Sequence, residues 1–271
     1  MRRPLLLRIP GLRRYGDEIA RLRRQIADME RPIAPPEAEI SDERLSTARR
    51  YDYYWYNADK KIDLRTIDIF GPIASRIRRK NRTFLHVDRL YTLWQGVVSL
   101  PEDATAVAEV GAYRGGSARF VAEAMRATNR ELPFYVCDTF RGHVEVDDAV
   151  DGLHAIGAQF TKTDAAAVAH YLRRFPAVQI LEGDIRETTA RIKNEHRFGL
   201  VHIDVDVYPI TKYCLEFFAP RTVRGGTIVV DDYGATTCPG AKKAADEFVG
   251  AHLRYRLLHL LTGQAVIVPL S

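Results

Sequence analysis

The sequence predicts an α/β fold, a doubly wound and mostly parallel seven-stranded sheet that a C-terminal antiparallel hairpin closes. Three observations lead to this prediction. Short apolar runs rich in β-branched residues alternate with helical patterns from residue 104 onward. These runs are continuous rather than alternating, which is typical of parallel strands that helices cover on both faces. The last segment is typical of a hairpin, because two apolar runs flank Thr262-Gly263.

The predicted elements follow one another in a strand–turn–helix rhythm. Strands are expected at 106–110, 134–138, 178–184, 200–206 and 227–233. Helices are expected at 84–99, from the end of the first strand to about residue 129, and at 164–174, 208–219 and 239–252. In such sheets ligands bind beyond the carboxyl ends of the strands, so the functional residues are sought there.

Composition excludes several classes of protein. The chain has 271 residues, 46% hydrophobic and 28% charged, which is ordinary for a globular protein. Its three cysteines are odd in number and form no CxxC pair, so we expect a reducing, cytoplasmic location rather than a disulfide framework. No apolar run approaches the roughly 18 residues of a membrane span.

The net charge of +5 belongs to the first 31 residues. They hold nine Arg and four acidic residues, whereas the rest of the chain holds 31 basic and 31 acidic residues. A neutral body disfavours nucleic acid as a partner. The basic leader leaves open a peripheral contact with the anionic inner face of a membrane.

Residues 1–36 are predicted to form an Arg-rich helical leader. Apolar residues recur in it with alternating spacings of three and four, at Leu12, Tyr15, Ile19, Leu22, Ile26 and Met29. This pattern fits a helix packed on the body or a short coiled coil in a homo-oligomer. Residues 37–100 are expected to be a helical cap or lid, and 101–271 the α/β domain. Five aromatic residues within Tyr51–Tyr56 suit either a subunit contact or an acceptor-binding wall.

A glycine-rich turn follows the first predicted strand. It reads Glu109-Val-Gly111-Ala-Tyr113-Arg114-Gly115-Gly116-Ser117. Glycines let the backbone turn tightly and approach a ligand. The G-x-x-x-G-G spacing differs from the dinucleotide fingerprint, which disfavours an NAD-dependent oxidoreductase. The acidic residue that precedes the glycines indicates a cationic group on the ligand.

Single carboxylates end the second and third predicted strands. Asp138 stands 27 residues after Gly111, where a carboxylate either accepts hydrogen bonds from a ribose diol or caps a turn. Asp184 is either a contact on the adenine side of a nucleotide or the N-cap of a helix over 185–192.

Two aspartate pairs end the fourth and fifth predicted strands. Asp204 and Asp206 are two apart, so on an extended strand they project from the same face, and Asp231-Asp232 end the next strand. Four converging carboxylates repel one another unless a proton or a cation intervenes. Mg²⁺ prefers oxygen ligands, so the pattern predicts a divalent-metal site. The alternative is that some of these acids are caps or pair with nearby lysines.

Together these motifs resemble the macrocin O-methyltransferase family, class I enzymes that use S-adenosylmethionine and Mg²⁺ to methylate sugar hydroxyls. The resemblance covers about residues 84–252. It rests on the glycine-rich turn, on Asp138-Thr139-Phe140, on the segment 202–211 and on the segment 225–233. The sequence departs from the family at Arg141-Gly142-His143-Val144, where Glu-Gly-Leu-Pro is usual, and at Pro209-Ile210, where Glu-Ser is usual. The first departure lies in the loop expected to meet the acceptor, so the sugar is left open.

The resemblance implies a role for each matching residue. S-adenosylmethionine would be held by Glu109, Gly111, Tyr113, Arg114, Gly115 and Ser117 around its methionine part, by Asp138 and Thr139 at the ribose, and by Asp184 near the adenine. Mg²⁺ would be held by Asp204, Asp231 and Asp232. Asp206 would be the general base, and His143 is a second candidate base because it follows Asp138 in the same loop.

The expected function is therefore O-methylation of a sugar hydroxyl, with a small-molecule glycoside or a lipid-linked glycan precursor as the acceptor. A catechol or phenol O-methyltransferase, or another small-molecule enzyme on the same fold, would share the cofactor and metal chemistry. A catalytically silent scaffold that only binds the cofactor is a further alternative. The strand-end acids disfavour it, because uncompensated carboxylates bring a scaffold no advantage.

Overall fold

The computed structural model describes residues 56–57, 62–64, 67–152, 154, 156–157 and 159–270, which lie in one compact unit spanning Ala48–Ser271. The predicted leader at 1–36 lies outside the described residues, and so do the side chains of the Tyr51–Tyr56 cluster. The coiled coil, the homo-oligomer and the membrane contact therefore stay predictions. None of the described helices is long and apolar enough to span a membrane.

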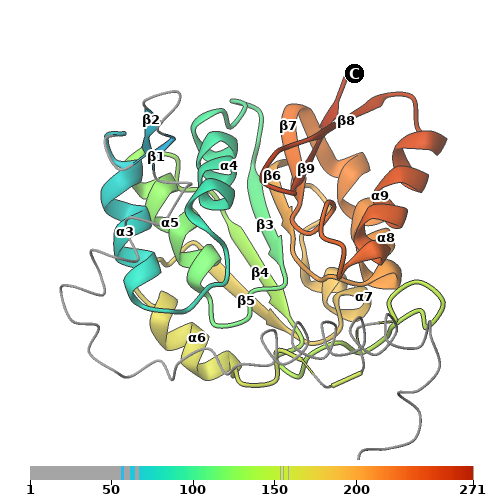
Figure 1. Ribbon diagram of the computed structural model, residues 1–271. Helices are drawn as coiled ribbons and strands as arrows, with labels where there is room; N and C mark the ends of the chain where they lie inside the picture. The colour runs from blue at the N-terminus through green and yellow to red at the C-terminus, as the bar shows by residue number, and fades with distance from the viewer. Residues whose placement is uncertain are drawn as a thin grey trace, which may run out of the picture. The chain divides into compact units, whose positions relative to one another are not determined.

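A seven-stranded sheet forms the centre of the unit (Figure 1). Its strands are β3 (Ala106–Val110), β4 (Phe134–Asp138), β5 (Val178–Glu182), β6 (Phe198–Ile203), β7 (Thr222–Val230), β8 (Tyr255–His259) and β9 (Ala265–Pro269). They lie in the order β5-β4-β3-β6-β7-β9-β8. β9 pairs antiparallel with both β7 and β8, while the pairs from β5 to β7 are parallel. The predicted doubly wound sheet with its closing hairpin is confirmed. A separate ribbon pairs β1 (Tyr56–Asn57) with β2 (Ile62–Asp63).

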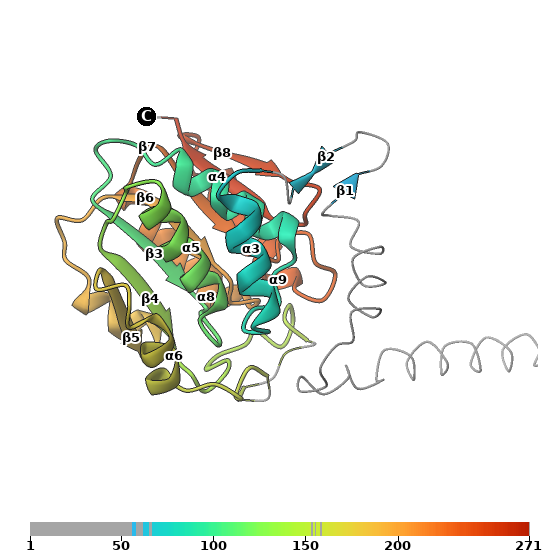
Figure 2. The same ribbon diagram turned by 90° about the vertical axis from the view of Figure 1, so that its left-hand side faces the viewer.

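Helices cover both faces of this sheet (Figure 2). One face carries α3 (Phe70–Arg79), α4 (Val87–Val98), α5 (Gly116–Ala127) and α6 (Ala165–Leu172), and the other carries α7 (Ile185–Thr188), α8 (Tyr208–Phe218) and α9 (Pro239–Ala251). Successive strand residues alternate between the two cores: Val107 packs with the first group of helices, and Ala106 and Ala108 pack with the second. Burial on both faces explains why the strands are apolar throughout. Short 3-10 turns at Thr189–Arg191 and Ala219–Arg221 follow α7 and α8.

The predicted cap region contributes two helices to the main core. α3 and α4 share one buried cluster with α5, in which the rings of Phe70 and Phe120 meet edge to face at 5.8 Å. The boundary between a cap and the α/β domain at residue 100 stays a prediction. In the structure these helices act as core-forming elements of the sheet's first face.

The strand ends differ from the prediction at the two places that matter for the site. β6 ends at Ile203 and β7 at Val230, so all four aspartates lie in loops beyond the strands. Asp206 has a left-handed backbone with φ of 63°. The prediction that Asp204 and Asp206 project from one face of an extended strand is therefore wrong. The physical reason is that the chain must leave the sheet after Ile203 to enter α8.

Candidate active site

A cavity of about 350 Å³ opens at the carboxyl ends of the parallel strands, where ligands bind in sheets of this kind. Eleven of the predicted site residues line it: Gly111, Tyr113, Ser117, Asp138, Thr139, His143, Asp184, Asp204, Asp206, Asp231 and Asp232. Three do not, namely Glu109, Arg114 and Gly115. The structure therefore brings most of the predicted site together in one place.

The glycine-rich turn brings the ends of β3 and β6 into close contact. Gly111 has φ of 93°, and a Cβ built on it would lie 1.8 Å from the backbone oxygen of Asp204. The Asp204 N–H in turn donates to the carbonyl of Val110 at 2.8 Å. Only glycine fits this left-handed close approach, which is the physical reason for the first glycine of the motif.

Asp138 holds together the loops that follow β3 and β4. Its carboxylate oxygens accept hydrogen bonds from the N–H groups of Tyr113 at 2.7 Å and of Phe140 at 2.6 Å. Burial raises the pKa of Asp138 above its ordinary value. The cap is thus present, and Asp138 also lines the cavity, so the cap and a ligand contact are compatible. The Thr139 hydroxyl donates to the carbonyl of Gly142 at 2.7 Å in the same loop.

Asp184 is the N-cap of α7, the structural alternative that the sequence left open. Its carboxylate accepts from the N–H of Arg186 at 2.9 Å and also pairs with the Arg186 guanidinium. Hydrogen bonding to Arg186 lowers the pKa of Asp184. Asp184 still lines the cavity, so the cap and a ligand contact are compatible.

Glu109 and Arg114 point elsewhere. Glu109 is fully buried, with Oε1 lying 2.9 Å from His202 Nδ1, while Oε2 has no hydrogen-bond partner. Arg114 donates to the carbonyl of Lys162 at 3.1 Å. The structure therefore does not bring the Glu109 carboxylate to the cavity wall, and it connects this residue with His202 instead.

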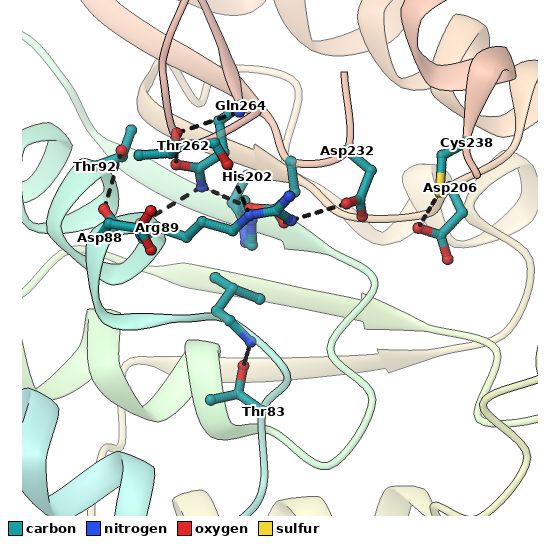
Figure 3. A network of polar contacts seen from close by, with 12 residues as sticks. Thr83, Asp88, Arg89, Thr92, His202, Asp206, Asp232, Cys238, Thr262 and Gln264 are labelled. Atoms are coloured by element: carbon teal, nitrogen blue, oxygen red, sulfur yellow. Dashed lines mark hydrogen bonds and ion pairs between the residues drawn. The ribbon is translucent and has the colours of Figure 1, made fainter. Parts of the chain in front are cut away.

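The predicted metal ligands and base form one group, here called the acid cluster, that consists of Asp204, Asp206, Asp231 and Asp232. Asp231 Oδ1 accepts from Gln264 at 2.6 Å and lies 3.3 Å from His202 Nε2. Its Oδ2 accepts from the Arg89 guanidinium, which also donates to Asp232 at 2.8 Å (Figure 3). Asp231 is thus the most tightly held member of the cluster.

The protonation of the acid cluster follows from burial and neighbouring charges. Burial acts to raise the pKa of Asp231, but hydrogen bonds from His202 and the charge of Arg89 hold it below its ordinary value. Burial acts to lower the pKa of His202, but contacts with Asp231 and Glu109 raise it well above the usual range. Burial and the contact with Asp232 raise the pKa of Asp206 to about 8.

The four carboxylates of the acid cluster fall into two groups whose ligand atoms lie within 4.8 Å of one another: Asp204 and Asp231 with His202, and Asp206 and Asp232 with Cys238. Burial and the charge of Asp231 raise the pKa of Asp204, whose carboxylate makes no hydrogen bond within the described part of the chain. Asp232 accepts from Arg89 and otherwise contacts Asp206. Oxygen donors in excess of positive charge are what Mg²⁺ binds. Asp231 fits less well, because both of its oxygens already accept hydrogen bonds.

Several residues of the site carry no local signal in the sequence. Arg89 lies on α4 and Gln264 in the hairpin turn, far along the chain from Asp231. Phe84 is 61% exposed beside the cavity, stacks on Tyr113 with ring centroids 5.3 Å apart, and meets Phe160 at 6.3 Å. These three rings line the cavity together and are here called the aromatic mouth.

Comparison with known families and proteins agrees with this architecture. Residues 108–233 match the family described as a methyltransferase domain. The mycinamicin III 3''-O-methyltransferase of Micromonospora griseorubida is 28% identical over 184 residues, which cover 63% of this chain and 71% of that protein. A second relative is 28% identical over 147 residues. It is the 8-demethyl-8-(2,3-dimethoxy-alpha-L-rhamnosyl)-tetracenomycin-C 4'-O-methyltransferase of Streptomyces olivaceus. That match covers 49% of this chain and 54% of that relative's length.

Solved structures share the fold. The O-methyltransferase NovP superposes with a TM-score of 0.59 at 23% identity, covering 70% of this chain and 83% of its own. The calicheamicin methyltransferase CalS11 superposes with a TM-score of 0.57 at 21% identity, covering 86% of this chain and 94% of its own. Residues 108–233 are similar to a methyltransferase domain, and they lie in a sheet with the strand order β5-β4-β3-β6-β7-β9-β8.

Proposed function

We propose that this protein is an O-methyltransferase that moves the methyl group of S-adenosylmethionine to a sugar hydroxyl and depends on Mg²⁺. The observation that carries the proposal is the single cavity at which the glycine-rich turn and the acid cluster meet. One side of this cavity has the features of a cofactor cradle, and the other has the groups needed to handle a hydroxyl proton. The sugar substrates in the names of the curated relatives support the acceptor class.

The cofactor side holds and orients the methyl donor. Gly111 and Asp138 line the cavity from adjacent strand ends, and so does Ser117 at the start of α5. A preorganised site of this kind lowers the activation free energy of the transfer, because the reacting atoms are already aligned when the ligands are bound. When bound, S-adenosylmethionine supplies an activated methyl group and Mg²⁺ lowers the pKa of the acceptor hydroxyl.

Asp206 is the proposed general base. It lines the cavity and lies next to Asp232, with its Oδ1 3.5 Å from the Cys238 thiol. A base works best with a pKa near the operating pH, and the raised pKa of Asp206 lies in that range. His143 also lines the cavity, but burial lowers its pKa to about 4, which makes it the weaker base. Asp204, Asp231 and Asp232 would hold Mg²⁺, and Asp231 would have to share the oxygen that accepts from Arg89.

The aromatic mouth indicates how the acceptor is received. Phe84, Tyr113 and Phe160 present ring faces and edges at the entrance, and such faces suit the apolar side of a sugar ring. The same rings suit a catechol or phenol acceptor, which is the second candidate function. A panel of rhamnosides and other glycosides, assayed beside catechols at equal concentration, separates the two.

The first test is a thermal-shift series with S-adenosylhomocysteine, with NAD⁺, and with Mg²⁺ against a chelator. A ligand that binds only the folded state raises the melting temperature with its occupancy. We expect a shift with S-adenosylhomocysteine and none with NAD⁺, and a separate Mg²⁺ shift that is lost in Asp231→Asn. A protein whose melting temperature responds to neither S-adenosylhomocysteine nor NAD⁺ binds neither cofactor, and the proposed activity is then wrong.

A further inference from the structure

A second cluster of metal-ligating side chains lies in the loop between β4 and α6. His143 and His154 come from this loop and Asp206 from the turn after β6. One ligand atom from each of the three lies within 4.8 Å of the other two. This set shares only Asp206 with the acid cluster, and its two imidazoles are at positions that the predicted magnesium site does not use. It therefore needs an explanation of its own.

The spacing of these atoms suits two ligands of one ion better than a hydrogen bond. His143 Nε2 lies 3.8 Å from Asp206 Oδ2, beyond hydrogen-bonding distance. Two ligands at about 2.0–2.1 Å from a tetrahedral zinc ion are roughly 3.3–3.5 Å apart, so a small adjustment brings both into place. The ring centroids of His143 and His154 are 5.1 Å apart and nearly perpendicular.

Both imidazoles present an unused nitrogen. The side chain of His143 is only 8% exposed, yet its Nε2 has no hydrogen-bond partner, and neither has the buried Nδ1 of His154. His154 Nε2 lies 3.1 Å from the carbonyl of Thr237, a contact that requires the proton on Nε2. The lone pair of His154 is therefore on Nδ1, and a backbone carbonyl on the opposite nitrogen is the usual outer-shell partner of a metal-binding histidine.

The chemistry of the set selects the kind of ion. Two neutral imidazoles and one carboxylate suit late first-row divalent cations such as Zn²⁺, whereas Mg²⁺ prefers oxygen ligands throughout. Buried imidazole nitrogens without partners are otherwise unfavourable, because a desolvated polar group that makes no hydrogen bond is destabilising.

We propose that His143, His154 and Asp206 form a binding site for a late first-row divalent cation, with Zn²⁺ as the reference ion. An ion there ties the loop over residues 140–160 to the turn after β6 and lies at the wall of the cavity. It takes Asp206 Oδ2 and leaves Oδ1, which faces Cys238. The departure of this loop from the usual family sequence at His143 then has a physical role, since it supplies a ligand.

The test uses the whole chain after a chelator has removed bound metal. Zn²⁺ is titrated in the presence of a chromophoric chelator that competes for it, and excess Mg²⁺ is present to occupy sites that prefer Mg²⁺. We expect one equivalent of Zn²⁺ to bind. His143→Ala and His154→Ala should each weaken Zn²⁺ binding by at least about 10-fold, the loss that even an outer-shell change causes at such sites. Titration with Co²⁺ should give visible absorption bands that both variants lose.

The matched control is His170→Ala, which removes an exposed histidine of α6 and should bind Zn²⁺ like the parent protein. Circular dichroism checks that each variant is folded. If His154→Ala does not fold, His154→Gln takes its place. Absence of Zn²⁺ binding, or Zn²⁺ binding unchanged in both loop variants, overturns the proposal. Binding that is lost in Asp231→Asn but retained in both loop variants places the ion in the acid cluster and overturns it as well.

Discussion

The two sides of the cavity are held in different ways. On the cofactor side, Asp138 accepts hydrogen bonds from backbone N–H groups, and Gly111 packs directly against the backbone of Asp204. On the acid side, Asp231 is held by the side chains of Arg89, His202 and Gln264. The first arrangement depends on backbone groups at neighbouring strand ends, and the second on side chains from three separate elements.

This difference suggests a division of labour. A side built from backbone contacts is rigid and suited to holding a cofactor that is always the same. A side built from charged groups in contact has pKa values that respond to whatever ion or ligand is present. Variants on the two sides test whether cofactor binding and turnover can be changed separately.

The largest expected effect is on turnover, in Asp206→Asn. Removing a positioned general base lowers the rate by about 10²–10⁴-fold. Because Asp206 is on the acid side, the dissociation constant of S-adenosylhomocysteine, measured by calorimetry, should stay unchanged. His143→Ala is the comparison variant, and a larger loss of turnover there would transfer the base role to His143. A parallel loss of cofactor affinity in Asp206→Asn would contradict the division.

The next effect is on stability, in Gly111→Ala. The added Cβ meets the backbone oxygen of Asp204, and the left-handed backbone is strained for alanine. We expect a destabilisation of roughly 3 kcal/mol, the upper end for strained backbone conformations. Chemical denaturation measures it. Gly250→Ala in α9 is the control, since nothing lies within 4 Å of its added Cβ, and it should be neutral or slightly stabilising. Equal effects in the two variants would refute the close-contact argument.

Features that come from a local sequence pattern could be predicted, whereas contacts between distant residues could not. Continuous apolar runs and glycine turns are local, so the strand positions and the glycine-rich turn follow from them. The left-handed backbone of Asp206 does not, because it depends on where the chain leaves β6 for α8. The Arg89 contact joins residues 142 positions apart, and no spacing in the sequence encodes it. Likewise Glu109 looks like a ligand contact by position, but the fold pairs it with His202.

A smaller effect is expected when Arg89 is changed to Met, which keeps the packing of the side-chain stem. Asp231 is 1% exposed and would lose the guanidinium, while His202 and Gln264 remain. We expect a loss of about 2 kcal/mol, below the roughly 3–5 kcal/mol for fully buried pairs. Arg89→Lys should restore part of it. Lys242→Met, which breaks the exposed pair with Asp246, is the control and should change the free energy of unfolding by under about 0.5 kcal/mol. A loss as small as that of the control would show that Arg89 is not needed to hold Asp231.

The smallest expected effect is on the pH dependence of the free energy of unfolding, which reports on the buried charged groups of the acid side. Burial acts to lower the pKa of His202, but contacts with Asp231 and Glu109 raise it well above the usual 6.5. A raised pKa in the folded state means that the folded protein holds a proton that the unfolded chain releases. The contribution of His202 to stability is therefore complete below pH 6.5, and it declines as pH rises from there through the higher folded pKa. Denaturation of the metal-free protein across this window should show that decline. His202→Gln should reduce its slope and leave the part that comes from Asp204 and Asp206, whose pKa values are also raised. A curve of the same slope in His202→Gln would mean that another group titrates and that His202 is neutral between its two carboxylates.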